Sequence, residues 1–294
     1  MATVGHIVLD YVGRKGRIRS PRPGGPCTYT GLAADSLDAK MVAVSKVGPD
    51  FGRKRLSWLR SYGVSTSHIR IASSSTTCFR INYRNGNRNM IVTSICDPMN
   101  SDDLSDFPLS SAIHIGPVLH EISPSLAIRL TNSDSLVGLD PQGYLRRLDS
   151  SGRVHVRNWI DHLLLKRIAV LKVSESELSA IIGIKWSIRK LSTLGPDIVL
   201  LTKGPRGMIV WSRENGMFSV PAYETLVRDP TGAGDALAGS FLVAWVRTSD
   251  LLWSAAVGSA MASMVVAKTS LTHFGNRRQI ERRATEILDQ TTRI

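Results

Sequence analysis

The sequence predicts an α/β protein in which helices cover both faces of a mostly parallel sheet. Short apolar runs alternate with helical stretches along most of the 294 residues, and this β-α-β-α order is typical of parallel sheets. A glycine-rich turn at residues 229–235 opens directly into a small and apolar stretch, 236–246, which predicts a buried helix. Because such folds place ligands at the carboxyl ends of their strands, we expect a site there.

The strands are predicted from short apolar runs, which span residues 4–9, 40–47, 112–115, 135–139, 168–172, 197–201 and 208–211. Helices are predicted between them at residues 28–37, 53–62, 123–131, 157–164 and 175–182. The most apolar helix candidate is residues 251–267. Small polar residues interrupt it and it is short for a membrane span, so we expect it to pack inside the protein.

Two segments depart from this alternation. Residues 10–23 are rich in Arg, Gly and Pro, and residues 76–93 contain two stretches of alternating polarity, 77–83 and 89–93. Asn85-Gly86, in the loop between those stretches, is a strong signal for a β-hairpin. A surface hairpin without a role in binding is the alternative to a functional one.

Length and composition favour one large domain. At 294 residues and 43% hydrophobic content the chain can bury a single large core. The N-terminus has no basic region and reaches Asp10 too early for a signal peptide, which predicts a buried first strand in a cytoplasmic protein. Cys27, Cys78 and Cys96 have no metal-ligand spacing, and their odd number predicts reduced thiols.

The formal net charge of +13 raises the question of nucleic-acid binding. The basic residues are spread out, and no helix-turn-helix, zinc-finger or aromatic-rich RNA-binding motif accompanies them. We therefore expect neither a nucleic-acid partner nor a membrane partner. A basic surface suits an enzyme that handles ATP equally well.

The turn from Asp229 to Asp235 predicts an anion hole. Glycines let backbone N–H groups converge on one point, and the helix start adds unpaired N–H groups and its positive dipole end. A carboxylate there would repel a bound phosphate, so Asp235 makes sense as a base beside a phosphate under attack. The alternative is an ordinary turn with flexible glycines. The chain has neither a P-loop nor a Gly-x-Gly-x-x-Gly motif after its first strand.

The residues Asp229-Pro230-Thr231-Gly232-Ala233-Gly234-Asp235 resemble the C-terminal signature of the ribokinase-like (PfkB) carbohydrate kinase family. Other segments along nearly the whole chain are similar to the family as well, among them residues 45–52 and 201–207. The resemblance implies a three-layer α/β/α ribokinase-like fold over residues 1–294, with a small β lid built from about residues 11–23 and 76–96. It also implies an ATP-dependent kinase that phosphorylates a small polyol or sugar.

The resemblance assigns residues to the acceptor. The di-glycine motif of the family matches Gly24 and Gly25, and an acceptor-binding Asp matches Asp10. A carboxylate can accept hydrogen bonds from two adjacent hydroxyls, as a polyol offers. Tyr29 stands where the family usually has an Asn, and the family's myo-inositol kinases also tend to lack that Asn and to carry an aromatic residue nearby. The segment from Asp140 to Arg146 is similar to that subgroup and to archaeal relatives, so the resemblance assigns Tyr29 and Asp140 to the acceptor as well. Myo-inositol or a related carbohydrate is therefore the favoured acceptor.

The resemblance also assigns residues to the phosphate donor and its metal ion. Residues 171–177 are similar to a family segment that organises Mg²⁺, and Glu177 would hold Mg²⁺ through water although Ser174 replaces the usual Asn. A monovalent cation is a further candidate cofactor. The residues expected to bind the nucleotide are Lys172, Ser174, Thr202, Gly204, Gly207 and Thr231.

The predicted reaction is phosphoryl transfer. Asp235 would take the proton of the attacking hydroxyl, while the amides of Gly232, Ala233 and Gly234 stabilise charge on the γ-phosphate. A nucleoside kinase of the same family and a catalytically silent nucleotide- or sugar-binding regulator are the alternatives. A homodimer formed through the lid is a further expectation.

Overall fold

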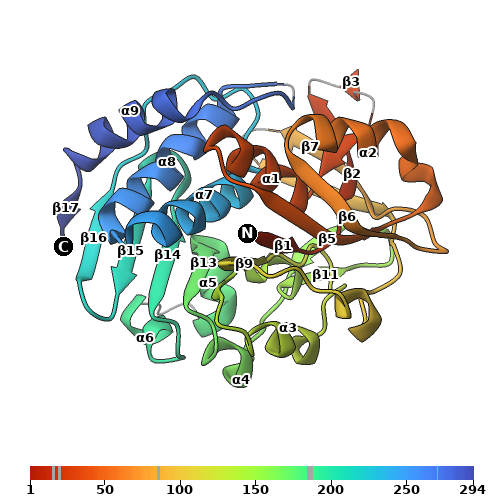
Figure 1. Ribbon diagram of the computed structural model, residues 1–294, viewed down its shortest axis with the longest axis horizontal. Coiled ribbons are helices and arrows are strands. Elements are labelled where there is room, and N and C mark those ends of the chain that lie inside the picture. The colour runs from red at the N-terminus through yellow and green to blue at the C-terminus, as the bar shows by residue number, and fades with distance from the viewer. Residues whose placement is uncertain (15–16, 19–20, 85–86, 184–187, 270) are drawn as a thin grey trace.

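The computed structural model describes residues 1–14, 17–18, 21–84, 87–183, 188–269 and 271–294. Their main feature is a ten-stranded sheet (Figure 1). From one edge to the other it contains β17 (Thr292–Arg293), β16 (Gly216–Val220), β15 (Met208–Ser212), β14 (Ile198–Thr202), β13 (Val170–Ser174), β10 (Leu136–Leu139), β9 (Ala112–Ile115), β1 (Ala2–Val4), β5 (Met41–Val47) and β6 (Val64–Ile71). Neighbours from β14 to β6 run parallel, whereas β15, β16 and β17 are antiparallel.

Helices cover both faces of this sheet, as predicted (Figure 1). One face carries α1 (Pro26–Ser36), α7 (Ala233–Thr248), α8 (Leu251–Val266) and α9 (Arg277–Leu288), and α2 (Gly52–Ser61) lies beside β6. The other carries α3 (Pro124–Leu130), α4 (His162–Leu165), α5 (Glu175–Ile182) and α6 (Ile188–Ser192).

The two layers of helices have separate cores because side chains alternate along each strand. In β14, Ile198 and Leu200 pack with the core of α7 and α8, while Val199 and Leu201 pack with the core of α3 to α6. Such runs of buried residues on both faces are typical of a covered parallel sheet. The predicted three-layer α/β/α architecture is confirmed.

A second, smaller sheet stands apart from the central one. Its strands are β3 (Arg17–Ile18), β2 (Val8–Arg14), β7 (Cys78–Arg84) and β8 (Asn87–Ser94) in that order, and β4 (Arg22–Gly24) also pairs with β2. β7 and β8 form the predicted hairpin, although its Asn85-Gly86 tip lies outside the described residues. Phe79, Ile81 and Met90 form a small apolar core of their own with Val118. Both segments predicted to form the lid contribute to this sheet.

The first predicted strand, residues 4–9, differs from the structure because it is divided between the two sheets. β1 pairs in the central sheet and β2 in the small one. The break falls near Gly5, whose φ of +152° is a conformation that glycine adopts readily. A Cβ added at this position would lie 2.2 Å from the Gly116 carbonyl oxygen, so a larger residue would not fit. The N-terminal strand therefore connects the core of the fold to the small sheet.

The structure also corrects one helix boundary. α4 starts at His162 rather than at residue 157, because the Asp161 carboxylate accepts a hydrogen bond from the Leu164 N–H at 2.9 Å and caps the helix there. Strands β6, β16 and β17, the short pair β11 (Arg146–Leu148) and β12 (Val154–Val156), and helices α6 and α9 are additional to the predicted elements.

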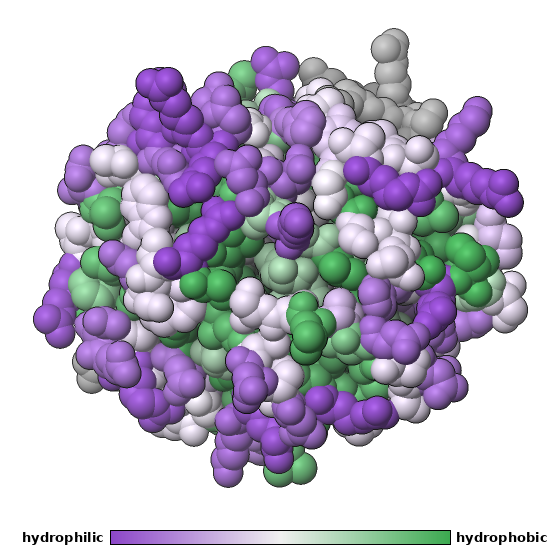
Figure 2. Space-filling view, in the orientation of Figure 1, coloured by the Kyte–Doolittle hydropathy of each residue, from purple (hydrophilic) through white to green (hydrophobic). Residues whose placement is uncertain are grey.

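No helix in the described part of the chain is long and apolar enough to span the bilayer. α8, the most apolar helix candidate, packs against α7 and α9 as expected for a core helix. Cys27, Cys78 and Cys96 are free thiols, as predicted. Figure 2 shows hydrophilic side chains gathered over α9, where the exposed residues include Arg277, Arg278 and Arg282.

Candidate active site

The predicted anion hole lies at the start of α7. Gly232 is the N-cap of this helix and has φ +80° and ψ 0°, a left-handed conformation that favours glycine. A Cβ at Gly232 would lie 2.1 Å from a ring carbon of the buried Tyr29. The Asp229 carboxylate accepts a hydrogen bond from the Thr231 N–H at 3.0 Å and holds the turn in shape. The close approach of Tyr29 thus requires glycine at this position.

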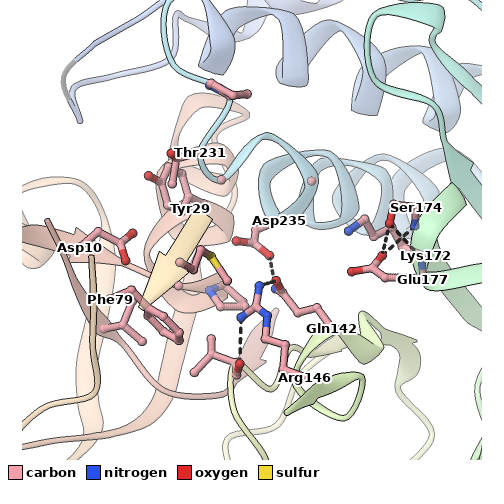
Figure 3. A pocket seen from close by; sticks show the side chains of 18 residues that line it. Asp10, Tyr29, Phe79, Gln142, Arg146, Lys172, Ser174, Glu177, Thr231 and Asp235 are labelled. Atoms are coloured by element: carbon pink, nitrogen blue, oxygen red, sulfur yellow. Dashed lines mark hydrogen bonds between the residues drawn. The ribbon is translucent and has the colours of Figure 1, made fainter. Parts of the chain in front are cut away.

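A cavity of about 220 Å³ opens in front of this turn (Figure 3). Gly232, Gly234 and Asp235 line it together with residues of α1, β2, β7, β13 and the segment after β10. Ala233 lies outside this cavity, and its N–H donates to the Pro230 carbonyl at 3.3 Å. Of the three residues whose amides were predicted to form the anion hole, Gly232 and Gly234 therefore line the cavity. The N–H of Ala233, in contrast, is already hydrogen-bonded within the turn.

Asp235 lies in the first turn of α7 and is 9% exposed. The Gln142 side chain donates a hydrogen bond from Nε2 to Asp235 Oδ1 at 3.0 Å, and Arg146 Nη2 donates to Gln142 Oε1 at 2.6 Å. Both residues line the cavity, and neither was singled out in the sequence. The only signal for them was their place in the segment from Asp140 to Arg146, which resembles the inositol kinase subgroup.

Lys172 places a positive charge directly beside the helix start. Its Nζ lies 2.9 Å from the position that a Cβ of Gly234 would take, and its ammonium donates to Asp140 Oδ2 at 2.7 Å. Burial alone would lower the pKa of the Lys172 ammonium, but the nearby carboxylates of Asp140, Glu177 and Asp235 raise it above its ordinary value. The side chain is therefore a fixed cation at the place where a phosphate would arrive.

Asp140 does not line the cavity, in contrast to its predicted contact with the acceptor. Its carboxylate is fully buried and accepts hydrogen bonds from Lys172 and from the Gln142 N–H at 3.2 Å. A carboxylate with these partners holds the Lys172 ammonium in place.

Glu177 and Ser174 lie at the edge of the cavity opposite Asp10 and Phe79 (Figure 3). They form a capping box at the start of α5, in which the Ser174 N–H and hydroxyl both donate to Glu177 Oε2, at 2.7 and 2.8 Å. Both bonds end on one oxygen, so Oε1 remains for a water of a hydrated cation. One carboxylate oxygen beside the predicted phosphate site would fit Mg²⁺, which keeps most of its waters.

The end of the cavity that holds the residues predicted to bind the acceptor is formed by the small sheet and α1. Val8 and Asp10 of β2 line it with Phe79 and Met90 of the hairpin. Gly25 lines it beside Val8, whose side chain would be 3.6 Å from a Cβ at Gly25. Gly24 lies behind Asp10, since a Cβ on Gly24 would lie 2.1 Å from Asp10 Oδ2. Gly24 thus makes room for the carboxylate and does not line the cavity itself. Tyr29 lines it beside the turn of Gly232.

A second cavity, of about 460 Å³, adjoins the first behind the start of α7. The residues Thr202, Gly204 and Gly207, all predicted to contact the nucleotide, line it. Its other walls are mainly apolar and come from α7, α8 and the segment after β16, and Tyr223 is among them. Pro230 and Gly234 line both cavities, so the two meet at the anion hole.

The small sheet contacts the motif directly. Tyr83 of β7 shares a hydrogen bond of 2.8 Å with the Thr231 hydroxyl, and Arg22 of β4 forms an ion pair of 2.6 Å with Asp229. Thr231, predicted to bind the nucleotide, lines the smaller cavity in the structure. These two contacts join the small sheet to the turn that forms the anion hole.

Comparison with known proteins identifies the family. A model of the pfkB family of carbohydrate kinases matches residues 20–276. The chain belongs to this family. Its members include kinases that transfer phosphate to a hydroxyl group, so the predicted enzyme class, a phosphotransferase with an alcohol acceptor, is confirmed.

Curated relatives of this kinase act on different acceptors. A cytidine kinase of Thermococcus kodakarensis is 26% identical over 278 residues, which is 91% of this chain and 96% of the relative. An inositol 3-kinase of Arabidopsis thaliana is 26% identical over 276 residues, covering 90% of this chain and 72% of the relative. A sugar or nucleoside kinase of the pfkB family is what these similarities support.

Solved structures confirm the ribokinase-like fold. A pyrophosphate-dependent kinase of the ribokinase family, solved with a pyrophosphate analog and myo-inositol, superposes with a TM-score of 0.81 at 23% identity, covering 96% of this chain and 99% of the other. The nucleoside kinase of Methanocaldococcus jannaschii gives a TM-score of 0.74 at 21% identity and covers 97% of this kinase and 98% of the other.

A buried histidine supports the helix start from behind. The Thr30 hydroxyl donates to the Asp235 carbonyl at 3.1 Å, so its oxygen accepts from Nδ1 of His114 at 3.0 Å. This leaves His114 Nε2 as the unprotonated nitrogen, and that atom is buried without a partner. Burial, with a smaller effect of Lys172, lowers the pKa of His114 to about 3.

We predict that this kinase loses stability in mild acid because of His114. An unfolded His binds its proton below about pH 6.5, whereas the folded one stays neutral until about pH 3, so stability falls with pH within that window. At pH 5 the loss is about 2 kcal/mol in the free energy of unfolding, at about 1.4 kcal/mol per pH unit. Urea unfolding at pH 7 and pH 5 measures it. His114→Gln should remove that part of the difference, and an unchanged pH dependence in the variant would contradict the assignment.

Proposed function

We propose that this kinase transfers the γ-phosphate of ATP to a hydroxyl of a small polyol or sugar, with myo-inositol or a related carbohydrate as the favoured acceptor. One observation carries the proposal: two cavities of different character meet at Gly234, beside the Asp235 carboxylate and the Lys172 ammonium. A donor in one cavity and an acceptor in the other would bring the phosphate and the hydroxyl together at the start of α7.

The larger cavity supports a nucleotide donor. Its mainly apolar walls suit a purine ring, and its junction with the anion hole suits the phosphates. Pyrophosphate, the donor of the similar structure described above, has no group that would fill such a space. Mg²⁺ near Glu177 would neutralise the phosphate charge when bound.

The smaller cavity supports a small acceptor. At about 220 Å³ it lies below the range of about 300–1,000 Å³ that is typical of sites for drug-sized ligands. Asp10, Gln142 and Arg146 offer hydrogen bonds to hydroxyls, while Phe79 and Met90 offer an apolar face to the carbon ring. This combination of polar and apolar walls suits a cyclic polyol.

The chemical step rests on the residues of this chain. Asp235 accepts the proton of the acceptor hydroxyl as that oxygen attacks the γ-phosphorus, and the bond from the γ-phosphorus to the β–γ bridging oxygen breaks to release ADP. The amides of Gly232 and Gly234 and the Lys172 ammonium stabilise the negative charge that the transferring phosphoryl group carries. The small sheet covers the acceptor with Phe79 and Met90 and so keeps water away from the phosphate.

An assay of ADP release over a panel of acceptors tests the proposed function. Myo-inositol and related polyols and sugars should support turnover with ATP, and cytidine and adenosine serve as the nucleoside alternative suggested by the cytidine kinase relative. Turnover with nucleosides alone would make the chain a nucleoside kinase. Binding of ATP without turnover on any acceptor would make it a silent regulator.

The donor is tested in the same assay. With the best acceptor, ATP should support turnover and pyrophosphate should not, and phosphorus NMR detects the phosphorylated product in both cases. Turnover with pyrophosphate alone would contradict the assignment of the larger cavity. Dimerisation through the small sheet, a monovalent cation and a cytoplasmic location stay predictions.

A further inference from the structure

A chain of hydrogen bonds runs from Arg146 through Gln142 to Asp235 (Figure 3). All three side chains line the smaller cavity, yet Gln142 and Asp235 are 93 positions apart in the sequence. Gln142 belongs to the single turn Pro141–Gly143 after β10, and its backbone N–H is fixed by the buried Asp140. The amide therefore reaches Asp235 from a rigid base.

The orientation of the Gln142 amide follows from its two partners. A guanidinium can only donate hydrogen bonds, so the atom that meets Arg146 must be the carbonyl oxygen of Gln142. The opposite end of the amide, Nε2, then necessarily faces Asp235, and the usual ambiguity between the two ends does not arise. Arg146 itself is held by a bond of 2.8 Å from Nη1 to the Val118 carbonyl and by the Phe79 ring, 5.7 Å away.

A neutral amide is a better hydrogen-bond partner for a general base than a cation is. A carboxylate paired directly with a guanidinium becomes a weaker base, because the opposite charge favours its ionised form. Here the Gln142 amide separates Asp235 from Arg146, so the carboxylate is held by a neutral hydrogen-bond donor and the guanidinium stays one residue further away. Lys172 is the other cation that interacts electrostatically with Asp235. Fixing one oxygen also restricts rotation of the carboxylate, which sets the direction of the other.

We propose that Gln142 is a positioning residue for the base Asp235, and that Arg146 acts by fixing the orientation of the Gln142 amide. This inference rests on the proposed function, in which Asp235 takes the proton of the acceptor hydroxyl. Gln142 orients the carboxylate toward that hydroxyl by fixing its Oδ1.

Gln142→Glu tests the proposal with almost no change in shape. The new carboxylate keeps its partner Arg146 but replaces a donor with a negative charge about 3 Å from Asp235, and two carboxylates at that distance cannot both ionise freely. We expect the acid limb of the pH profile of kcat to shift to higher pH by about one pH unit or more. We expect kcat at neutral pH to fall about 10- to 100-fold. A lost hydrogen bond to a charged group raises the activation barrier by an amount that lowers the rate about 10- to 100-fold. Thermal unfolding of the variant shows whether the fold is intact.

Two further variants separate positioning from charge. Gln142→Leu removes the donor without adding a charge and should lower kcat by about the same 10- to 100-fold. Gln290→Glu makes the same chemical change at an exposed position and should leave kcat and its pH profile unchanged. The KM for ATP should stay within about twofold in every variant, because Gln142 does not line the larger cavity.

The outcomes distinguish this inference from the function on which it rests. If Gln142→Glu and Gln142→Leu keep the wild-type kcat and pH profile while Asp235→Asn abolishes turnover, the positioning role is wrong and the base assignment stands. If Asp235→Asn itself keeps its turnover, the proposed base is wrong. A loss of kcat in both Gln142 variants, with the shifted acid limb in Gln142→Glu, supports the positioning role.

Discussion

Asp235→Asn should fold, bind ATP and lose nearly all turnover. The substitution keeps the size of the side chain, and the amide oxygen of Asn can still accept the hydrogen bond that Gln142 donates to Asp235 Oδ1. What is lost is the ability to accept a proton. General base catalysis contributes about 10²–10⁴-fold, so kcat should fall by that factor.

The experiment needs three measurements on the purified variant. Turnover with the best acceptor gives kcat, calorimetric titration gives the affinity for ATP, and thermal unfolding shows whether the fold is intact. Asp250→Asn is the matched control, because Asp250 caps α8 at the surface through the Trp253 N–H and Asn is an equally good cap. A kcat above about a tenth of the wild-type value in Asp235→Asn would mean that this carboxylate is not the base.

The residues that the sequence could place at the candidate site are those that lie next to one another in the chain. The turn of Gly232 and Gly234 and the carboxylate of Asp235 are adjacent in the chain, so their combined chemistry is visible in a short motif. The alternation of strands and helices predicted the three-layer architecture for the same reason, since each element carries its own pattern of apolar residues. Element boundaries failed where a single contact decides them, as with the cap at Asp161.

Gln142 and Asp140 could not be assigned from the sequence because their roles depend on distant partners. Gln142 becomes part of the site only when the end of β10 meets the start of α7, 93 residues later. Asp140 has the residue type of an acceptor ligand, but it faces Lys172 of the neighbouring strand β13 and is buried with it. A parallel sheet places the ends of sequentially distant strands side by side, and no local pattern records which side chains then meet.

Gly232→Ala should have the largest effect on the fold of the active site. The left-handed conformation costs a non-glycine residue about 1–2 kcal/mol. The new methyl group would also lie 2.1 Å from the ring of Tyr29, which is 2% exposed and stacks in parallel on Phe274 with ring centroids 6.4 Å apart. Overpacking of this kind costs about 1–3 kcal/mol more, so we expect a total loss of about 2–5 kcal/mol in the free energy of unfolding.

Gly204→Ala separates the two contributions. Gly204 also has a positive φ, +59°, but a Cβ there would meet no atom within 4 Å, so this variant should lose only the conformational part, about 1–2 kcal/mol. Urea unfolding of both variants gives the two free energies. Because Tyr29 cannot move away, the turn of Gly232 must move instead, and a shift of about 1 Å at the anion hole should cost about 10²-fold in kcat. Equal stability of the two variants would show that Tyr29 yields to the methyl group, and the requirement for glycine would then come from the backbone alone.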